Sequence, residues 1–189
     1  MANHFAQRNG LVLWFTGLSG AGKSTIAELV GAELERDGHA IEYLDGDVVR
    51  EHLSKGLGFS KEDRDTNIER IGWVASRLTR HGATVIVSAI SPYRETRDRA
   101  RALVEAHGRF VEVHVATSVE ECARRDVKGL YAKALSGELP EFTGVSDPYE
   151  EPASPELRID TEEHEPGESA RMIVAKLEEL GLVESGVPA

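Results

Sequence analysis

Leu11 to Thr25 reads LVLWFTGLSGAGKST, and this stretch decides the fold. Its first part, Leu11 to Phe15, is an apolar, β-prone run with the length of a buried strand. Gly17 to Ser24 matches the phosphate-binding pattern G-x-x-x-x-G-K-[ST] in full, and apolar residues at helical spacing follow from Ile26 to Leu34. Strand, loop and helix therefore stand in the order that predicts binding of a nucleoside triphosphate.

The glycines of this loop let successive N–H groups turn toward phosphate oxygens, and the following helix adds its dipole. We expect Lys23 to reach the β- and γ-phosphates and the Ser24 hydroxyl to ligate Mg²⁺. The alternative of an ordinary glycine-rich turn is disfavoured by the matched strand and helix around it. The predicted nucleotide-binding residues are Gly17, Leu18, Ser19, Gly20, Ala21, Gly22, Lys23, Ser24 and Thr25.

The composition limits the classes of protein that this chain could belong to. Its 189 residues fit one domain, expected over 1–189 with a core at 11–182. The net charge of −11 argues against a nucleic-acid partner, because phosphate neutralisation needs a basic surface. Cys122 has no second cysteine to pair with and is expected to be buried. No apolar run has membrane-spanning length, and the first ten residues lack the apolar core of a signal peptide, so we expect a soluble, cytoplasmic protein without a membrane partner.

Strand and helix patterns alternate along the chain. Strands are expected at 11–15, 40–44, 83–87, 110–115 and 157–159, and helices from 26, 48, 60, 91, 119 and 168. We expect Ser60 to cap the long helix with Asp63 as its capping-box partner. Ser91 and Pro92 are expected as the N-cap and first residue of the next helix. These β–α units predict an α/β fold of the P-loop NTPase type, with a parallel sheet of about five strands and helices on both faces.

The polar, glycine- and proline-rich segment 128–155 is too long for a plain connection and is interpreted as a mobile lid. The tail 184–189 is expected to be frayed. Ligands of parallel sheets gather at the carboxyl ends of strands. That rule selects the loop at Gly17, the corner at Asp45 to Asp47, the corner at Ser88 to Ser91 and the segment that begins at Lys128.

The corner Asp45-Gly46-Asp47 is the best-placed pair of carboxylates, because the third strand ends in Ser88 rather than in the usual metal-binding Asp. No N-K-x-D sequence is present, which weighs against a GTPase. Asp47 could orient an acceptor hydroxyl or take its proton, and Asp45 could contact the metal through a water. An acidic turn that caps a helix explains the same residues equally well.

Five further blocks carry a family resemblance. They are LDGDVVR (44–50), LGFSKEDRDTNI (57–68), ISPYRETRDRAR (90–101), RDVKGLY (125–131) and FTGVSDPYEEP (142–152). In this order and spacing, from about 11 to 182, the chain resembles adenylylsulfate kinase (APS kinase). The resemblance implies ATP-dependent phosphorylation of the ribose 3′-hydroxyl of adenylyl sulfate (APS), in sulfate assimilation, with ADP and 3′-phosphoadenylyl sulfate (PAPS) as products and Mg²⁺ as cofactor.

The resemblance also implies an acceptor site. Phe59 and Phe142 match aromatic residues that sandwich the adenine, while Arg50, Arg64 and Asn67 match positions that hold the phosphosulfate; a loop-anchoring role for the aromatics and a solvated charged face remain the alternatives. Lys128, Leu130 and Tyr131 match the family's lid. The full implied set of APS-binding residues is Asp47, Arg50, Phe59, Arg64, Asn67, Ile90, Ser91, Lys128, Leu130 and Phe142.

The catalytic residues implied are Lys23, Asp47 and Ser91. In bacterial members of the family the position of Ser91 is a phosphoserine intermediate. A serine before a proline at a helix start equally describes an N-cap, and such a serine is a poor nucleophile without a base. We therefore hypothesise direct in-line transfer, in which Asp47 handles the acceptor hydroxyl, and Ser91 positions substrate through its backbone and cap.

Three departures from the family pattern are Val48, Ala89 and the pair Pro140-Glu141. They leave room for a kinase of a different small hydroxyl acceptor. A catalytically silent nucleotide-binding partner of a sulfurylase is a second rival, although Lys23, Ser24 and Asp47 are intact. The resemblance further implies a homodimer and possible functional coupling to a separate ATP sulfurylase.

Overall fold

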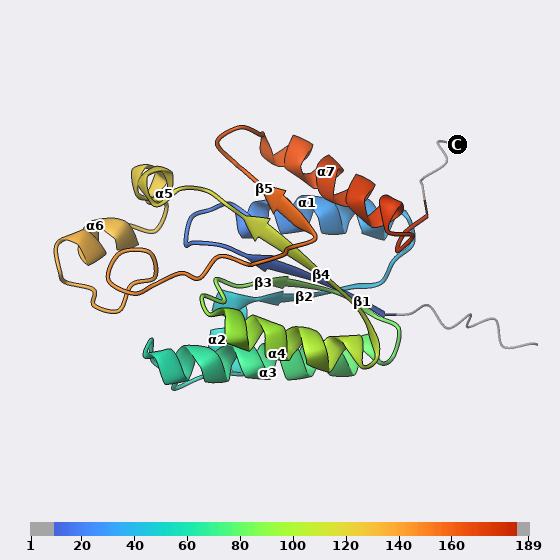
Figure 1. Cartoon of the computed structure of the whole chain (residues 1–189), viewed down its shortest axis with the longest axis horizontal. Helices are drawn as coiled ribbons and strands as arrows, with labels where there is room; N and C mark the ends of the chain where they lie inside the picture. The colour runs from blue at the N-terminus through green and yellow to red at the C-terminus, as the bar shows by residue number, and fades with distance from the viewer. Residues whose placement is uncertain (1–9, 185–189) are drawn as a thin grey trace, which may run out of the picture.

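The computed structural model describes residues 10–184, whose elements alternate between strands and helices (Figure 1). The expectations for the first nine residues and for 185–189 lie outside this range. Within it the strands are β1 (Gly10–Thr16), β2 (Ile41–Asp45), β3 (Thr84–Ser88), β4 (Gly108–Val115) and β5 (Leu157–Ile159). The helices are α1 (Lys23–Arg36), α2 (Gly46–His52), α3 (Lys61–Thr79), α4 (Arg94–Glu105), α5 (Val119–Arg125), α6 (Leu130–Leu135) and α7 (Pro166–Glu179).

The five strands form one sheet in the order β2-β3-β1-β4-β5, and every pairing is parallel. β1 is central, so that Leu13 lies beside Ile86 of β3 and Val111 of β4. Helices cover both faces, with α1 and α7 on one side and α3 and α4 on the other (Figure 1). The expected P-loop NTPase-type sheet is therefore confirmed.

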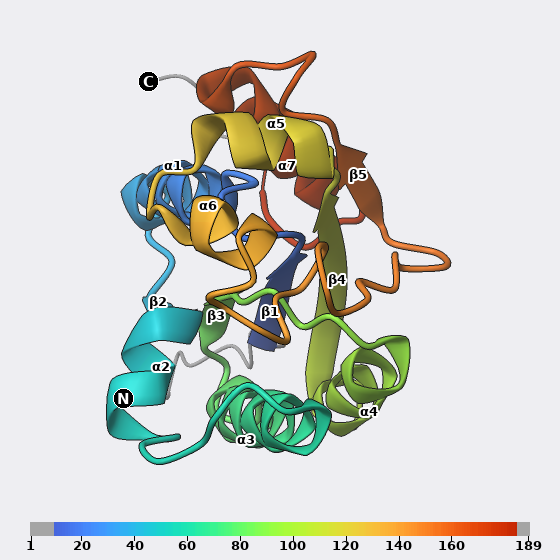
Figure 2. The same cartoon turned by 90° about the vertical axis from the view of Figure 1, so that its left-hand side faces the viewer.

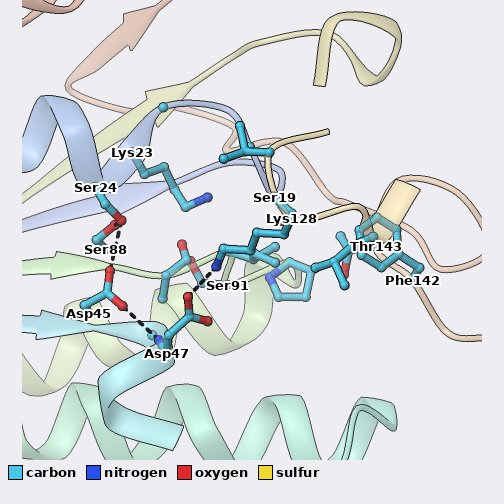
Figure 3. A pocket seen from close by; sticks show the side chains of 18 of the residues that line it. Ser19, Lys23, Ser24, Asp45, Asp47, Ser88, Ser91, Lys128, Phe142 and Thr143 are labelled. Carbon is cyan, nitrogen blue, oxygen red and sulfur yellow. Dashed lines mark hydrogen bonds and ion pairs between the residues drawn. The ribbon is translucent and has the colours of Figure 1, made fainter. Parts of the chain in front are cut away.

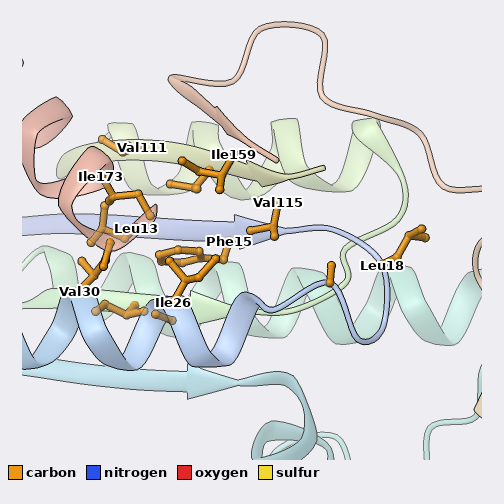
Figure 4. Close-up of a cluster of buried hydrophobic side chains, with 14 of the residues drawn as sticks. Leu13, Phe15, Leu18, Ile26, Val30, Val111, Val115, Ile159 and Ile173 are labelled. Atoms are coloured by element: carbon orange, nitrogen blue, oxygen red, sulfur yellow. The ribbon is translucent and has the colours of Figure 1, made fainter. Parts of the chain in front are cut away.

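The unbroken apolar run of β1 divides its side chains between the two faces, because successive residues of a strand point in opposite directions. Leu13 and Phe15 join the cluster packed under α1 and α7 (Figure 4), whereas Val12 and Trp14 join the cluster under α3 and α4. Each of these four side chains is fully buried. β1 is thereby fixed from both sides, and so is the start of the loop that follows it.

One predicted capping contact, in α3, and one predicted helix start, that of α4, need correction. Ser60 caps α3 as expected, since its Oγ accepts a hydrogen bond from Asp63 N at 3.2 Å. The Asp63 carboxylate, however, accepts from Gly58 N at 2.8 Å and so secures the preceding turn rather than the cap residue. α4 begins at Arg94 with Tyr93 as its N-cap, so Ser91 and Pro92 precede the helix. Ser91 has φ 41°, a left-handed conformation in which it does not act as the cap.

The segment 128–155 carries structure that the sequence analysis did not predict. It contains α6 and an isolated bridge between Thr143 and Asp147. Tyr131 and Phe142 are buried in the cluster under α1 and α7. Figure 2 shows that this segment lies near the carboxyl ends of the strands, on the other side from α2 and α3.

The burial of Cys122 and the character of the helices can also be compared with expectation. Cys122 is buried, as expected. Among the helices of residues 10–184, none combines the length and the apolar character needed to cross a membrane.

Candidate active site

A cavity of about 740 Å³ lies at the carboxyl ends of β1, β2 and β3, and residues at the start of α6 also line it. All ten residues proposed to bind the acceptor line it. Ser19, Gly20, Gly22, Lys23, Ser24 and Thr25 of the phosphate loop line it as well. Gly17, Leu18 and Ala21 do not line this cavity, and all three are buried. The fold thus brings the predicted donor and acceptor residues to one cavity.

The phosphate loop has the backbone that its glycines allow. Gly17 has φ 149°, and an added Cβ would clash with the carbonyl oxygen of Val115. Gly22 has φ 99° and is the N-cap of α1, so the free N–H groups of that helix begin at the cavity. A side chain at either position would strain the loop that is expected to hold the phosphates.

Lys23 is buried beneath this loop with 8% of its surface exposed. Its Nζ donates hydrogen bonds to the carbonyl oxygens of Gly17 at 2.9 Å and Leu18 at 2.7 Å. Burial lowers the pKa of Lys23 to about 8. The ammonium is therefore held close to where phosphates would lie, and a polyphosphate would favour its charged form.

A set of oxygens lies next to the loop (Figure 3). Ser24 Oγ donates to Asp45 Oδ2 at 2.9 Å and lies 3.1 Å from Ser88 Oγ. The other oxygen of Asp45 accepts from Asp47 N at 2.9 Å and caps α2. The capping and metal-contact interpretations of Asp45 are thus compatible, because each uses a different oxygen.

Asp47 lies in the first turn of α2 with its side chain exposed. The ammonium of Lys128, from the segment between α5 and α6, donates to Asp47 Oδ2 across the cavity (Figure 3). These residues are 81 positions apart in the chain. The contact joins the two edges of the cavity and places a cation on the carboxylate proposed as the base.

The two proposed adenine-stacking residues have different surroundings. Phe59 is 54% exposed, and the guanidinium of Arg50 lies 4.5 Å from its ring centre. Phe142 is only 8% exposed and meets Tyr131 edge-on at 4.9 Å. The hydroxyl of Tyr131 donates to Ser19 O at 3.0 Å, which ties this wall to the phosphate loop. Phe59 thus presents a largely exposed ring with a guanidinium over it, whereas Phe142 also belongs to the core.

Arg64 and Asn67 are both buried on α3. Arg64 donates to Phe59 O at 2.6 Å, to Thr143 Oγ1 at 2.7 Å and to Glu141 O. A guanidinium has five N–H donors, so those left over could still contact an oxyanion. The Asn67 Oδ1 atom has no hydrogen-bond partner among the described residues.

Ser91 lines the cavity, but its hydroxyl is turned toward the core. Its side chain is 1% exposed, and Oγ accepts a hydrogen bond from Trp14 Nε1 at 3.1 Å. The hydroxyl also lies 3.3 Å from Ala89 O, to which it donates. The partner of Ser91 is therefore an indole of β1 rather than a helix start, because the left-handed turn directs the side chain inward.

The cavity is also lined by residues to which the sequence analysis assigned no binding role, although it singled out the corners at 45–47 and 88–91, the pair Pro140-Glu141, and Tyr131 of the lid. They are Arg125, Asp126, Val127, Tyr131, Leu139, Pro140, Glu141, Thr143, Thr161, His164, Glu165 and Pro166, together with Ile26, Gly46, Ile68, Ser88, Ala89 and Pro92. The rule on carboxyl ends of strands applies equally to the segments after β4 and β5, and it could have identified Arg125 and Thr161. Of the departures from the family pattern, Ala89 lines the cavity, whereas Val48 is exposed and does not.

Comparison with known proteins gives consistent matches. The model of the family "Adenylylsulphate kinase" matches residues 9–160. An adenylyl-sulfate kinase of Chloroflexus aurantiacus is 56% identical over 176 residues, which cover 93% of each chain. The Mycobacterium tuberculosis APS kinase CysC in complex with AMPPNP and APS has a TM-score of 0.86 and 44% identity, over 90% of this chain and 98% of that one. The hexameric APS kinase from Thiobacillus denitrificans has a TM-score of 0.74 and 42% identity, over 94% of this chain and 30% of that one.

Proposed function

The chain belongs to the adenylylsulphate kinase family, and on this basis we propose how its residues phosphorylate adenylyl sulfate. The protein is an ATP-dependent kinase of this acceptor. The observation that carries the residue assignments is the single cavity, in which the phosphate loop and all ten acceptor residues meet.

The donor side holds ATP through the loop from Gly17 to Thr25. N–H groups at the start of α1 bind phosphate oxygens, and Lys23 exchanges its two carbonyl contacts for the β- and γ-phosphates. Its buried position keeps water from competing for the ammonium. These contacts would hold the γ-phosphoryl group in one position beside the loop.

Mg²⁺ is proposed as the cofactor, held by Ser24 Oγ, by ATP phosphates and, through water, by Asp45. The hydroxyl and carboxylate oxygens that meet 2.9 Å apart fit a hard cation that keeps several waters. Within residues 10–184 there is no cluster of three or more His, Cys, Asp or Glu side chains that could form a metal cage, which suits an ion brought with its nucleotide. The ion would offset charge on the transferring phosphoryl group.

On the acceptor side, Phe59 stacks on the adenine and Phe142 closes its other face. Arg50, Arg64 and the side-chain amide N–H of Asn67 donate to the phosphosulfate, while Asn67 Oδ1 accepts from a hydroxyl or amino group elsewhere on the acceptor. The 3′-oxygen attacks the γ-phosphorus as the bond from that phosphorus to the β–γ bridging oxygen breaks. ADP leaves, and the hydroxyl proton passes to Asp47.

Lys128 then has two partners in the cycle. Before substrates bind, it pairs with Asp47. With substrates bound, it turns to their phosphates and leaves the carboxylate to the hydroxyl. We infer that 128–155 acts as a lid in this exchange, which closes over both nucleotides and excludes water. Ser91 contributes the shape of the turn rather than a phosphoenzyme, because its hydroxyl lies against Trp14.

We further propose that the chain is a single domain, that it works as a cytoplasmic homodimer, and that it receives its acceptor from a separate sulfurylase. ATP is the co-substrate, which favours the cytoplasm. Light scattering of the purified chain would report the number of subunits.

The test of function is ADP release from ATP–Mg²⁺ with and without adenylyl sulfate, with the nucleotide product identified by mass. Acceptor-dependent ADP and an equal amount of PAPS are expected. Tight ATP binding without such turnover would contradict the assignment and would direct attention to Ala89 and to Pro140-Glu141 for another acceptor.

A further inference from the structure

A buried guanidinium lies next to the acceptor side of the cavity without lining it. Arg97 of α4 is 2% exposed. Its Nε donates to Glu112 Oε1 of β4 at 2.9 Å, its Nη1 to Ser91 O at 2.6 Å, and its Nη2 to Glu150 O at 2.6 Å. One planar group thus connects α4 and β4 to the turn of residues 89–92 and to the segment after the bridge at Asp147.

The turn of residues 89–92 needs such support. Ser91 has φ 41°, a conformation that L-residues rarely adopt and that surrounding contacts must hold. Trp14 Nε1 holds its side chain, and Thr16 Oγ1 donates to Ile90 O at 2.7 Å. Arg97 holds its carbonyl. Because all four residues of the turn line the cavity, these contacts set the shape of one acceptor wall.

The segment 147–150 is attached to the same turn. Glu150 N donates to Pro92 O at 2.8 Å, and the hydroxyl of Tyr93 donates to Asp147 Oδ2 at 3.0 Å. This segment follows Phe142 and Thr143, which form the opposite acceptor wall. Because Arg97 binds both Ser91 O and Glu150 O, it fixes the position of one acceptor wall relative to the other.

We propose that Arg97 is a positioning residue that shapes the site for adenylyl sulfate and leaves the ATP site largely unaffected. The inference rests on the proposed function. The link from this turn to the phosphate loop, Gly17 N to Ile90 O, is long at 3.5 Å, and Thr16 keeps that carbonyl in place when Arg97 is changed. If Arg97 had a purely structural role, its replacement would instead change the KM for adenylyl sulfate and the KM for ATP to the same extent.

The chain offers a matched control in Arg101. It lies one helical turn further along α4 and also approaches Glu112, at 3.5 Å. Its main partner is Glu156, at 2.8 Å and 2.9 Å, and none of its described hydrogen bonds reaches residues 89–92. Replacing it disturbs the same charge network without touching the turn.

The experiment compares Arg97→Lys, Arg97→Met and Arg101→Met in a Trp73→Phe background. The chain has two tryptophans, and Trp73 is 58% exposed, so the remaining Trp14 reports on Ser91 by its fluorescence. A lysine keeps a cation beside Glu112 but cannot make the three-way contact of a planar guanidinium. The KM for adenylyl sulfate, the KM for ATP and the Trp14 emission maximum are measured.

For both Arg97 variants we expect the KM for adenylyl sulfate to rise about tenfold or more, as for a lost charge-assisted hydrogen bond, with the KM for ATP within about twofold. The Trp14 emission should shift. Arg101→Met should change neither KM beyond about twofold. The guanidinium of Arg101 lies 4.6 Å from the ring centre of Phe110, which stacks on Trp14, so the control rests on the two KM values and not on the emission. If Arg97→Met does not fold, Arg97→Lys decides.

An unchanged KM for adenylyl sulfate in Arg97→Lys, or equal rises for both substrates, would overturn the proposal. So would the same rise in the KM for adenylyl sulfate in Arg101→Met. Absence of acceptor-dependent ADP release by the wild type would instead refute the proposed function. In that case the Trp14 emission alone decides whether Arg97 holds the turn, with an unshifted maximum in Arg97→Lys counting against it.

Discussion

The ammonium of Lys128 lies on the carboxylate of Asp47, and this contact joins the segment before α6 to the first turn of α2. The side chains are 55% and 74% exposed, so water and salt screen the pair. The pair therefore contributes little to the free energy of unfolding. Both residues line the cavity, so we expect the pair to matter for the reaction rather than for stability.

We expect Lys128 and Asp47 to be nearly uncoupled in stability. A double-mutant cycle with Lys128→Met and Asp47→Asn should give a coupling below about 1 kcal/mol in the free energy of unfolding, because exposed pairs contribute little. Urea denaturation of the four proteins measures it. A coupling of several kcal/mol would mean that the pair holds the fold together.

Asp47→Asn should lower kcat about a hundredfold or more, because the amide cannot accept the proton of the acceptor hydroxyl. The KM for ATP should change little. Steady-state kinetics with each substrate varied gives both values. Retention of wild-type kcat would exclude Asp47 as the base.

Ser91→Ala should keep most of its turnover, since Oγ faces Trp14 and not the cavity. The lost hydrogen bond should cost about 1 kcal/mol of stability. The kinetic comparison is paired with a trap for labelled phosphoenzyme in the wild type after mixing with ATP labelled at the γ-phosphate. A loss of several orders of magnitude, together with labelled Ser91, would restore the phosphoserine mechanism.

ATP affinity should depend on pH through Lys23, whose pKa burial lowers to about 8. In the free protein this side chain loses its proton as the pH rises through 8, and binding of the phosphates restores it, so affinity should fall as the pH rises. Calorimetry at pH 8 in buffers of different ionisation enthalpy should show uptake of about half a proton per ATP, and almost none at pH 6. Equal uptake at both pH values would contradict this origin.

Phe59→Ala and Phe142→Ala should affect different quantities. Phe59 is 54% exposed, so its loss should raise the KM for adenylyl sulfate about tenfold, the value of one stacked base, without lowering Tm. Phe142 is 8% exposed in the core, and its loss should also cost about 3 kcal/mol of stability. Thermal unfolding beside kinetics separates the two. Equal changes in Tm would show that Phe59 is a structural anchor as well.

Stability at acid pH should depend on His114, which is 3% exposed on β4 and stacks on Tyr149 at 5.8 Å. Burial lowers the pKa of His114 from 6.5 to about 4. Between these values the unfolded chain binds a proton that the folded chain does not, so the free energy of unfolding falls as the pH falls, by at most about 3 kcal/mol. Above pH 6.5 this residue contributes no pH dependence.

The variant His114→Phe keeps a ring against Tyr149 and removes the titrating group. Denaturation of both proteins at pH 7 and pH 5 should show a smaller loss of stability in the variant. An identical loss in the two proteins would assign the acid sensitivity to other groups.

Local sequence determined the frame of this protein. The run from Leu11 to Phe15 specified a strand buried on both faces, and the glycines at 17 and 22 specified a loop that no other residue type could form without strain. The alternation of strand and helix patterns then required a parallel sheet, whose carboxyl ends gather the binding residues. Each of these signals spans only a few residues, because backbone preferences and hydrophobic periodicity are properties of neighbouring residues in the chain.

The tertiary structure alone decided which partner each polar side chain has. Ser91 turns to Trp14, 77 residues away, Arg64 to Thr143, 79 away, and Lys128 to Asp47, 81 away. Hydrogen bonds and ion pairs act over about 3 Å, so they depend on which segments the fold brings together. A serine before a proline is compatible with a helix cap by its local preference, but the indole of β1 lies within reach and the left-handed turn directs the hydroxyl to it.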